Sequence, residues 1–318
     1  MTPDRSDMTT TDTPHTDIAF DQRLRVVFDD LQKTFGDVAL RHGITFEELG
    51  QAITYVTKLV ASGEFPLAAI SLLGNHPMEV SYGMAYAHPE KDGASTWIPT
   101  GPAYVPGAPE IDNPGVLPMA PDEPGETLLV SGTVRSTSGK PLPGAVVDLW
   151  QTTAGGRYAG LTPEQAGPLE GLDVVDFDLP KYHLRGKIVA DAEGRYEYRT
   201  VLPGVETAAV PGSLFDGLLL MLGRANSRAR HIHAHITHDD HHMLTHQIHF
   251  DGDPLVDTVS EGAIARELIH KTELHDDAEW EARGLTGPYR TLTCDYTLRP
   301  IGFDEVKDPY VLEGFWKQ

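Results

Sequence analysis

Apolar positions recur every three to four residues in the first part of the chain, which is the spacing of amphipathic helices. A second helix is expected to begin at Thr45, which has capping-box spacing to Glu48, and a third helical stretch follows at residues 66–73. We predict an all-α domain over residues 18–90, after a disordered Thr-, Asp- and Pro-rich tail over residues 1–17. One face of the first helix is formed by Leu24, Val27, Phe28 and Leu31.

The pattern changes twice after this helical domain. Residues 91–126 are rich in Pro and Gly, which disfavour helix and strand, and they predict a long connector. From residue 127 to residue 318, short apolar stretches are separated by turn residues, as in an all-β domain. The fold class is therefore predicted to be mainly β, with an antiparallel β-sandwich domain behind the N-terminal all-α domain.

Residues 228–250, RARHIHAHITHDDHHMLTHQIHF, contain eight of the 15 histidines. His231, His233 and His235 alternate with apolar residues, as in a half-buried strand, so their imidazoles share one face. Neutral imidazole is the commonest metal ligand and suits iron, zinc or copper. We predict that His231 and His233 bind one metal ion, while His235 either supports that site or belongs to the packed structure.

Four more histidines flank the turn THDDHH. Their neighbours are polar, and most of them are expected to be solvated loop residues rather than ligands. These residues are His238, His241, His242 and His246.

Charge and cysteine content limit the class of function. The formal charge is −22, with 25 Lys and Arg against 47 Asp and Glu, which disfavours nucleic-acid binding and leaves a small-molecule substrate. Cys294 is the single cysteine, so an intrachain disulfide is excluded, which fits a reducing compartment. The sequence has neither a signal-peptide core nor an apolar run of ~20 residues, so we expect a soluble, cytoplasmic protein without a membrane span.

Several motifs resemble, in order and spacing, the intradiol ring-cleaving dioxygenases, specifically the catechol and hydroxyquinol 1,2-dioxygenase branch. The resemblance runs from about Arg23 to about Gly252. It implies a non-haem Fe(III) enzyme that opens a catechol- or hydroxyquinol-type ring between its two hydroxyls with O₂, and a homodimer formed through the N-terminal helices. The motifs are GPAYVPGAPE, SGTVRSTSGKPLPGAVVDLWQTTAGGRY, LRGKIVADAEGRYEYRTVLP, RARHIHAHI and THQIHF.

The resemblance also implies roles for individual residues. Tyr158 in GGRY matches the first of two tyrosinate ligands of iron, and His231 and His233 match the histidine pair. Arg228 and Gln247 match the polar pair that stabilises the substrate and the charge that develops on its ring.

The second tyrosinate has no counterpart in this sequence. Counting forward from the GRY motif places Glu206 at its position, whereas counting backward from His231 places Thr207 there. A set of Tyr158, Glu206 and two histidines keeps two anionic ligands for Fe(III), but a carboxylate with two histidines also resembles the facial triad of Fe(II) oxygenases. Alternatively, Glu206 is a solvated loop acid and the iron has three protein ligands.

Replacing the tyrosinate affects chemistry as well as coordination. In the family, the second tyrosinate leaves the metal when substrate binds and takes one catechol proton. A phenolate with a pKa near ~10 does this readily, whereas a carboxylate with a pKa near ~4 has several units less driving force. Ring cleavage is therefore expected to be slower, or to be diverted to another substrate.

The resemblance places the substrate pocket beside the iron. The family usually has a phenylalanine near Ala103, so a roomier pocket is expected here. Tyr182 lies in a long insertion, where it either reaches the pocket mouth or packs, and Tyr196 and Tyr198 are expected in the core or on the surface. The predicted pocket residues are Leu72, Leu73, Gly101, Pro102 and Ala103.

Two alternatives to ordinary ring cleavage follow from the same residues. The segment GTVRSTSGKPLPGAVVDLWQTTAGGRY also resembles transthyretin-like and adhesin sandwich modules, which bind without catalysis. The missing tyrosinate suggests instead a divergent family member that oxidises a specialised aromatic compound without intradiol cleavage.

Overall fold

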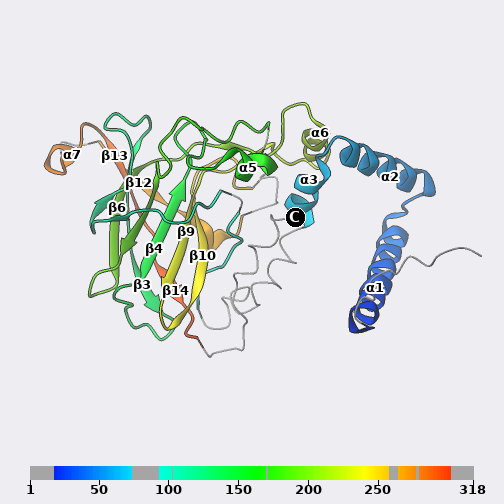
Figure 1. Ribbon diagram of the computed structural model, residues 1–318, viewed down its shortest axis with the longest axis horizontal. Coiled ribbons are helices and arrows are strands. Elements are labelled where there is room, and N and C mark those ends of the chain that lie inside the picture. The colour runs from blue at the N-terminus through cyan, green and yellow to red at the C-terminus, as the bar shows by residue number, and fades with distance from the viewer. Residues whose placement is uncertain are drawn as a thin grey trace, which may run out of the picture. The chain divides into compact units, whose positions relative to one another are not determined.

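The computed structural model describes most of the chain (Figure 1). It divides into two compact units, residues 1–58 and residues 59–318. The tail predicted at residues 1–17 lies outside the described residues. The described residues are 18–73, 93–101, 103–169, 171–257, 264–276 and 279–301.

Helices occupy the N-terminal region in which the apolar spacing predicted them. Thr45 and Glu48 form the predicted capping box: the Glu48 carboxylate accepts from the Thr45 N–H at 2.8 Å, and the Thr45 hydroxyl accepts from the Glu48 N–H at 3.2 Å. Residues 74–90 of the predicted helical domain lie outside the described residues. The helices are α1 (Ile18–His42), α2 (Phe46–Ala61) and α3 (Phe65–Leu73).

Two sheets form the sandwich of the second unit (Figure 1). The first sheet has the order β1 (Glu110–Ile111), β5 (Arg185–Val189), β4 (Val146–Gln151), β9 (His231–His238), β10 (His241–Phe250) and β11 (Ile269–His270). The second has the order β12 (Thr272–His275), β13 (Tyr289–Thr293), β3 (Thr127–Ser136), β6 (Arg195–Val201) and β2 (Gly115–Val116), and β14 (Tyr296–Leu298) also pairs with β3. The described chain is therefore mainly β with N-terminal helices, as predicted.

Strand direction is more varied than the prediction of an antiparallel sandwich. The pairs β4–β5, β4–β9, β9–β10, β3–β6 and β12–β13 are antiparallel. Parallel pairs occur where strands return over long connections, at β1–β5, β2–β6, β10–β11, β13–β3 and β14–β3. The apolar alternation of a strand determines which face is buried, and it contains no information on the direction of the partner.

The core lies between the two sheets. Ile232, Ala234 and Ile236 of β9 are fully buried in it, and Tyr196 and Tyr198 of β6 enter from the other sheet, so of the two expected locations, core and surface, they occupy the core. The faces of β9 differ from the prediction, however. His231, His233 and His235 are also buried, so β9 is covered on both faces instead of being half-buried.

The hairpin of β9 and β10 corrects the expectation for the next four histidines. The turn consists of Asp239 and Asp240 alone, so His238, His241 and His242 belong to the strands and are half-buried. His246 is buried inside β10. The polar composition of the segment suggested a loop, but a tight turn allows both strands to continue up to it.

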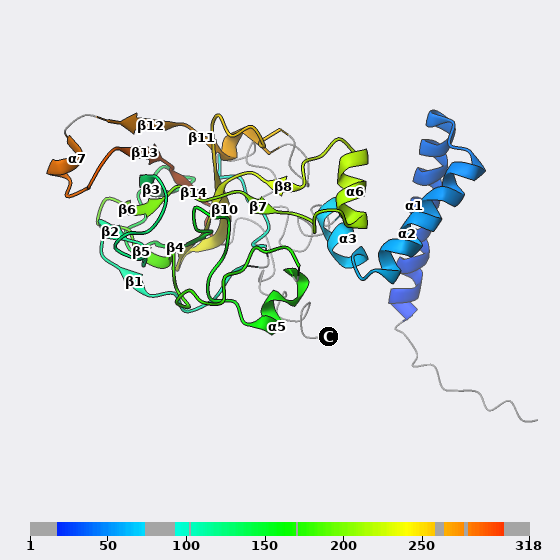
Figure 2. The same cartoon turned by 90° about the horizontal axis from the view of Figure 1, so that it is seen from above.

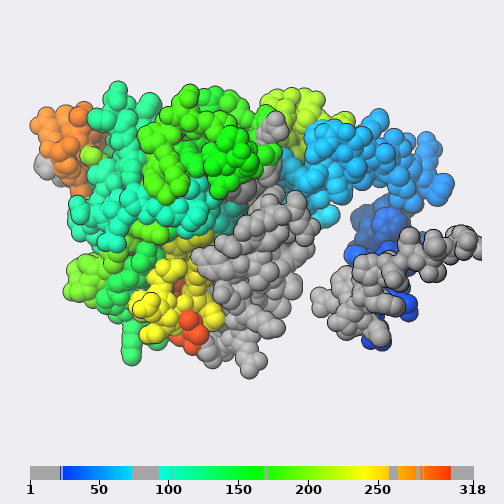
Figure 3. All heavy atoms as spheres, in the orientation of Figure 1, coloured from blue at the N-terminus to red at the C-terminus, as the bar shows by residue number. Residues whose placement is uncertain are grey.

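Connecting segments cover the outer face of the first sheet. In Figure 3 the green atoms around α5 (Pro163–Ala166) lie beside the turquoise atoms of the connector that precedes β3. A short pair, β7 (Glu206–Thr207) and β8 (Ser227–Arg228), flanks α6 (Leu214–Met221), which lies beside α3 in Figure 2. The remaining elements are η2 (Gly167–Leu169), η3 (Arg266–Leu268) and α7 (Glu279–Ala282).

No helix among the described residues combines the length and the apolar content that a membrane crossing needs.

Candidate metal centre

Strand β9 brings His231 and His233 to the covered outer face of the first sheet. Because side chains alternate along a strand, the apolar even-numbered residues occupy the core and the histidines face the covering segments. The Nε2 atoms of His231 and His233 lie 3.0 Å apart. His231 donates its Nδ1–H to the Ala229 carbonyl at 2.7 Å, which leaves its Nε2 lone pair directed at the site. Trp150 of β4 stacks on His233, with ring centroids 4.7 Å apart.

Tyr158 approaches this pair from the segment that follows β4. Its hydroxyl oxygen lies 3.0 Å from Nε2 of His233 and 3.4 Å from Nε2 of His231. Hydrogen bonds on both sides hold its backbone, from its N–H to the Val174 carbonyl and from the Asp176 N–H to its own carbonyl, each at 2.8 Å.

A glycine permits the close packing of the Tyr158 segment against the chain that enters β7. Gly156 has a φ of 79°, and a Cβ at this position would collide with the Val205 carbonyl. Any other residue would push Tyr158 away from the segment that carries Glu206. The GGRY motif is therefore a structural requirement of the site as well as the source of Tyr158.

Glu206 is the residue that the fold presents to the histidines. Its side chain is 7% exposed, and its Oε1 lies 3.5 Å from Nε2 of His231. In the β7–β8 ladder it pairs with Arg228, whose guanidinium lies 3.1 Å from the same oxygen. Its neighbour Thr207 is half-buried and pairs with Ser227. The forward count from GRY thus identified the residue at the site, and Glu206 is not a solvated loop acid.

Gln247 and Arg228 adjoin the cluster, as the resemblance implied. Gln247 is the β10 residue directly opposite His233, and its amide nitrogen lies 3.2 Å from Nδ1 of His233. Its amide oxygen lies 3.1 Å from Nε2 of His249, a buried histidine two residues further along the strand. Arg228 has 26% of its side chain exposed, so it borders the site while remaining accessible.

Burial and charge set the protonation of the cluster. Burial raises the pKa of Tyr158 well above its ordinary value of 10.0; the Glu206 charge raises it further, against the opposing charges of Arg228 and Arg185. Burial, with His231 and Arg228 nearby, holds the pKa of His233 well below 6.5. His233 is therefore neutral, which is the form of imidazole that binds metals, and Tyr158 must release a proton in order to become a ligand.

Arg185 was not identified from the sequence. It is 1% exposed, and its guanidinium donates to the Ala159 carbonyl at 2.7 and 3.0 Å and to the Ala103 carbonyl at 2.8 Å. It thereby joins the Tyr158 segment to the connector, and burial lowers its pKa to about 10. Its position at the start of an apolar strand gave no sign of burial. The two-residue spacing of His249 from Gln247 could have indicated that it shares the face of the site, whereas no sequence pattern pointed to Trp150.

The predicted pocket residues are placed unequally. A Cβ on Gly101 would lie 3.6 Å from Cε1 of His233, so the connector passes directly over the site. Ala103 is buried, and its carbonyl accepts a hydrogen bond from Arg185. Leu72 is half-buried at the end of α3, whereas Leu73 is 73% exposed. Pro102 lies outside the described residues.

Tyr182 and Tyr196 make hydrogen bonds to backbone carbonyls, and His235 packs beside the site. Tyr182 donates its hydroxyl to the Pro106 carbonyl at 3.2 Å, which anchors the connector. Tyr196 donates to the Cys294 carbonyl at 2.6 Å inside the core. His235 is 5% exposed, and its Nε2 lies 3.0 Å from the Thr100 hydroxyl.

Comparisons with known proteins identify the family of this chain. The family model described as Dioxygenase matches residues 99–299. The chain is similar to a catechol 1,2-dioxygenase of Pseudomonas sp. (strain EST1001), with 34% identity over 90% of this chain and 89% of that protein. It is also similar to a chlorocatechol 1,2-dioxygenase of Rhodococcus opacus, with 32% identity over 78% of this chain and 89% of that protein.

The fold is shared with solved structures of the same group. A catechol 1,2-dioxygenase from Pseudomonas arvilla C-1 matches with a TM-score of 0.69 and 27% identity, covering 93% of this chain and 90% of that one. Matches of this extent in both sequence and fold are not expected of a sandwich that merely binds or spaces other groups. The chain therefore belongs to the intradiol ring-cleaving dioxygenases, a family of non-haem iron enzymes.

Proposed function

We propose that Tyr158, Glu206, His231 and His233 hold one iron ion, and that this site uses O₂ to open a catechol- or hydroxyquinol-type ring between its two hydroxyls. The observation that carries the proposal is the convergence of four buried donor side chains from three separate segments. Family membership supports the reaction class, and the geometry supports the choice of ligands.

The donor atoms fit a metal ion in both spacing and chemistry. Ligand atoms about 2.0–2.1 Å from a metal, at roughly right angles, lie about 3 Å from one another. The phenol oxygen of Tyr158 and the two imidazole nitrogens are 3.0, 3.0 and 3.4 Å apart, and the carboxylate of Glu206 is 3.5 Å from one of them. Two imidazoles with two oxygen donors suit iron.

The charge of the set favours Fe(III). Tyr158 as a tyrosinate and Glu206 as a carboxylate supply two negative charges, which offset the higher charge of the ferric ion. Ferric iron bound there would act as a Lewis acid toward a catecholate and make its ring reactive toward O₂. The iron of this proposal is therefore ferric at rest, and the facial-triad alternative with Fe(II) leaves Tyr158 without a function.

Glu206 takes the place of the second tyrosinate in this scheme. Its Oε1 lies between Nε2 of His231 and the guanidinium of Arg228, at 3.5 and 3.1 Å. Arg228 can therefore hold the carboxylate beside a bound catechol when Glu206 is not a ligand. In that position Glu206 accepts one catechol proton, although a carboxylate is a much weaker base than a phenolate.

The weaker base has a consequence for the substrate. A ring with electron-withdrawing substituents has more acidic hydroxyls, so its proton transfers more readily to a carboxylate. We therefore expect Glu206 to favour electron-poor catechols, such as halogenated ones, over unsubstituted catechol. The small side chain of Ala103 is consistent with a substituent on the ring.

Arg228 and Gln247 act on the substrate itself. The Arg228 guanidinium borders the site and stabilises negative charge that develops on the ring during oxygenation. Gln247 is held between His233 and His249, so its amide dipole has a fixed direction. Trp150 and Gly101 close the region around His233 and help to exclude water from it.

The test combines metal analysis with spectroscopy. Protein expressed with iron supplied should contain about one iron per chain and show a visible tyrosinate-to-iron charge-transfer band. Tyr158→Phe should abolish the band, whereas Tyr182→Phe, which changes a tyrosine on the connector, should preserve it. Stoichiometric zinc without iron, or a ferric protein that remains colourless, would contradict the proposal.

The product distinguishes ring cleavage from another oxidation of the aromatic. Replacement of a tyrosinate by Glu206 is the observation that favours the second candidate function, oxidation of a specialised aromatic without intradiol cleavage. With ¹⁸O₂, intradiol cleavage places both oxygen atoms in an acyclic dicarboxylic acid. A product that retains its ring, or that carries a single labelled atom before exchange with water, would support the second candidate.

We also propose that the protein is a homodimer through its N-terminal helices. The apolar face of α1 is open to solvent in the single chain: Leu24, Phe28 and Leu31 are 54%, 57% and 63% exposed. An amphipathic helix is stable when such a face is covered, and a second copy is the occupant that the resemblance implies. Sedimentation should give twice the 34.8 kDa chain mass, and Leu31→Glu should produce monomers.

A further inference from the structure

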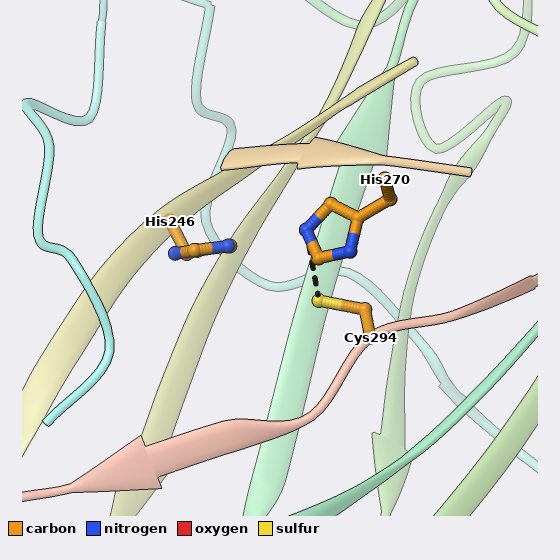
Figure 4. Close-up of side chains that lie close together, drawn as sticks. All are labelled: His246, His270 and Cys294. Atoms are coloured by element: carbon orange, nitrogen blue, oxygen red, sulfur yellow. Dashed lines mark hydrogen bonds between the residues drawn. The ribbon is translucent and has the colours of Figure 1, made fainter. Parts of the chain in front are cut away.

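A second cluster of metal-binding side chains lies on the opposite face of β10 (Figure 4). Gln247 faces the candidate iron site, so its neighbour His246 faces the core between the two sheets. There His246 meets His270 of β11 and Cys294, which lies between β13 and β14. These three residues, the core cluster, have not been assigned a role in the proposed reaction.

The spacing of the core cluster is close to that of a metal site. One ligand atom from each residue lies within 4.8 Å of the other two, and Sγ of Cys294 is 3.7 Å from Nε2 of His270. Around a tetrahedral zinc ion, with Zn–N near 2.0–2.1 Å and Zn–S near 2.3 Å, the ligand atoms lie about 3.4–3.6 Å apart. Small side-chain rotations are sufficient to reach that spacing.

His246 has the orientation of a ligand that is already positioned. Its Nδ1–H donates to the Thr96 carbonyl at 2.9 Å, so Nε2 carries the lone pair. The side chain is 3% exposed, and Nε2 has no hydrogen-bond partner among the described residues. In Figure 4 this nitrogen points toward His270. A buried polar atom without a partner is costly, and a metal ion would remove that cost.

The other two residues are arranged in the same way. Nε2 of His270 faces the Cys294 sulfur at 3.7 Å, and burial lowers the pKa of His270, against the opposing effect of the Thr293 backbone, so the imidazole favours its neutral form. Cys294 is 1% exposed and is a free cysteine. Two imidazoles beside a buried thiol form a typical ligand set for a thiophilic ion.

We propose that His246, His270 and Cys294 bind a thiophilic ion of the zinc(II) or copper(I) type, separate from the iron. Thiolate and imidazole ligands select such ions, whereas the two oxygen donors at Tyr158 and Glu206 select ferric iron. The ion joins β10 and β11 of one sheet to the β13–β14 connection of the other, so its role is to stabilise the sandwich. Copper(I) can bind with three ligands, whereas zinc would need a fourth ligand in addition to these three residues.

Binding has a defined proton balance. Burial raises the pKa of the Cys294 thiol to about 12, so the metal-free site holds a protonated sulfur. The ion forms a bond to sulfur and displaces that one proton to solvent, with no change in oxidation state. Binding should therefore strengthen as pH rises, and it requires no reductant or oxidant.

The first experiment uses the wild-type holoprotein and the metal alone. Elemental analysis after dialysis should find about one zinc or copper per chain in addition to iron, and it identifies which of the two ions is held. Metal-depleted protein titrated with Co²⁺ should develop a near-ultraviolet thiolate-to-cobalt band with one equivalent bound. Iron as the sole metal, together with a cobalt titration that gives no thiolate band, would overturn the proposal.

Variants locate the ion and separate it from the iron. Cys294→Ser and His270→Gln should lose the second metal and the cobalt band, retain iron and its visible band, and lower Tm by several degrees. His238→Gln changes another histidine of the same hairpin and should leave both metals, both absorption bands and Tm unchanged. His231→Ala should lose iron while keeping the second metal.

The variants can also refute the proposal. Retention of the second metal by both Cys294→Ser and His270→Gln would place it elsewhere. Because His270 is half-buried and Cys294 is deeply buried, His270→Gln supplies the answer if Cys294→Ser fails to fold. Failure of the iron proposal would appear differently, as loss of the visible band with the zinc or copper content intact.

Discussion

The two faces of the β9–β10 hairpin differ in what they bury. On the inner face, Ile232, Ala234 and Ile248 are fully buried apolar side chains. On the outer face, His231, His233 and Gln247 are nearly as buried, but each has a polar partner. The same backbone therefore supports a core on one side and chemistry on the other, and the covering segments make the second possible because they supply partners for buried polar groups.

His246 is the exception on the inner face. It alternates in phase with the core residues of β10, and its Nε2 has no hydrogen-bond partner among the described residues. On the outer face, the corresponding nitrogens meet other donors and acceptors at 3.0–3.5 Å. Both arrangements leave imidazole nitrogens available to an ion, and the two proposed sites differ in their other ligands, which are oxygen on the outer face and sulfur on the inner face.

The largest expected effect comes from separate alanine substitutions of two adjacent β9 residues whose side chains lie on opposite faces of the strand. His233→Ala removes a proposed iron ligand, so iron affinity should fall by more than about 100-fold, beyond the 10–100-fold that outer partners are worth. Ile232→Ala should retain iron and colour but lose about 2–5 kcal/mol of stability, because it leaves a cavity in the core. Iron analysis and urea unfolding measure the two effects.

That pair of variants also has an outcome that would break the comparison. If Ile232→Ala lost its iron while His233→Ala kept it, the two faces would not be functionally separate. A control is Ile236→Ala, which has the same core parity but lies further from the histidine pair along β9. It should resemble Ile232→Ala in stability and wild type in iron content.

Glu206 is expected to give the next largest effect. Glu206→Ala should weaken iron binding by at least the roughly 10–100-fold that loss of an outer partner costs, and it removes the carboxylate that the Arg228 guanidinium contacts. Glu206→Tyr should restore a second tyrosinate, change the visible band and increase the rate with unsubstituted catechol relative to halogenated catechol. Thr207→Ala is the matched control, because it alters the neighbouring residue of β7, which is the other candidate from the sequence count. Unchanged metal content and spectrum in both Glu206 variants would remove Glu206 from the ligand set.

The sequence carries a direct signal for one part of this candidate site and no local signal for another part. Alternation alone identified His231 and His233, because two residues separated by one on a strand share a face whatever the rest of the fold does. Tyr158 and Glu206 lie 48 positions apart in the chain, and their meeting depends on how the segment after β4 folds back onto β7. Only the resemblance to a family could connect them.

Other features could not be foreseen because they depend on packing between distant elements. Arg185 is buried because two backbone carbonyls from separate segments accept its hydrogen bonds. The core cluster combines strands of both sheets, and the parity of His246 was hidden by the polar turn beside it. A period-two count from Ile248 back to His246 would have placed that histidine in the core.

Acid sensitivity is the next prediction, and it concerns the third histidine of β9. Burial lowers the pKa of His235 from 6.5 to about 4, so between these values the unfolded chain binds a proton that the folded state excludes. Stability should therefore fall as pH decreases from 6.5 toward 4, by up to about 1.4 kcal/mol per pH unit from this residue. His235→Gln should reduce the slope of unfolding free energy against pH by that amount. An unchanged slope would show that His235 is not held neutral.

The smallest effect, from Thr100→Val, decides whether His235 supports the metal site or belongs only to the packing beside it. The Thr100 hydroxyl lies 3.0 Å from Nε2 of His235, and the connector then continues to Gly101, where an added Cβ would lie 3.6 Å from His233. The substitution keeps the shape and removes the hydrogen bond, so it should cost about 1 kcal/mol of stability. If His235 supports the site by fixing the connector, KM should rise while the visible iron band stays the same. If it only packs, stability should fall with kcat and KM unchanged, and Thr245→Val, which alters the facing position on β10, should then give a similar result.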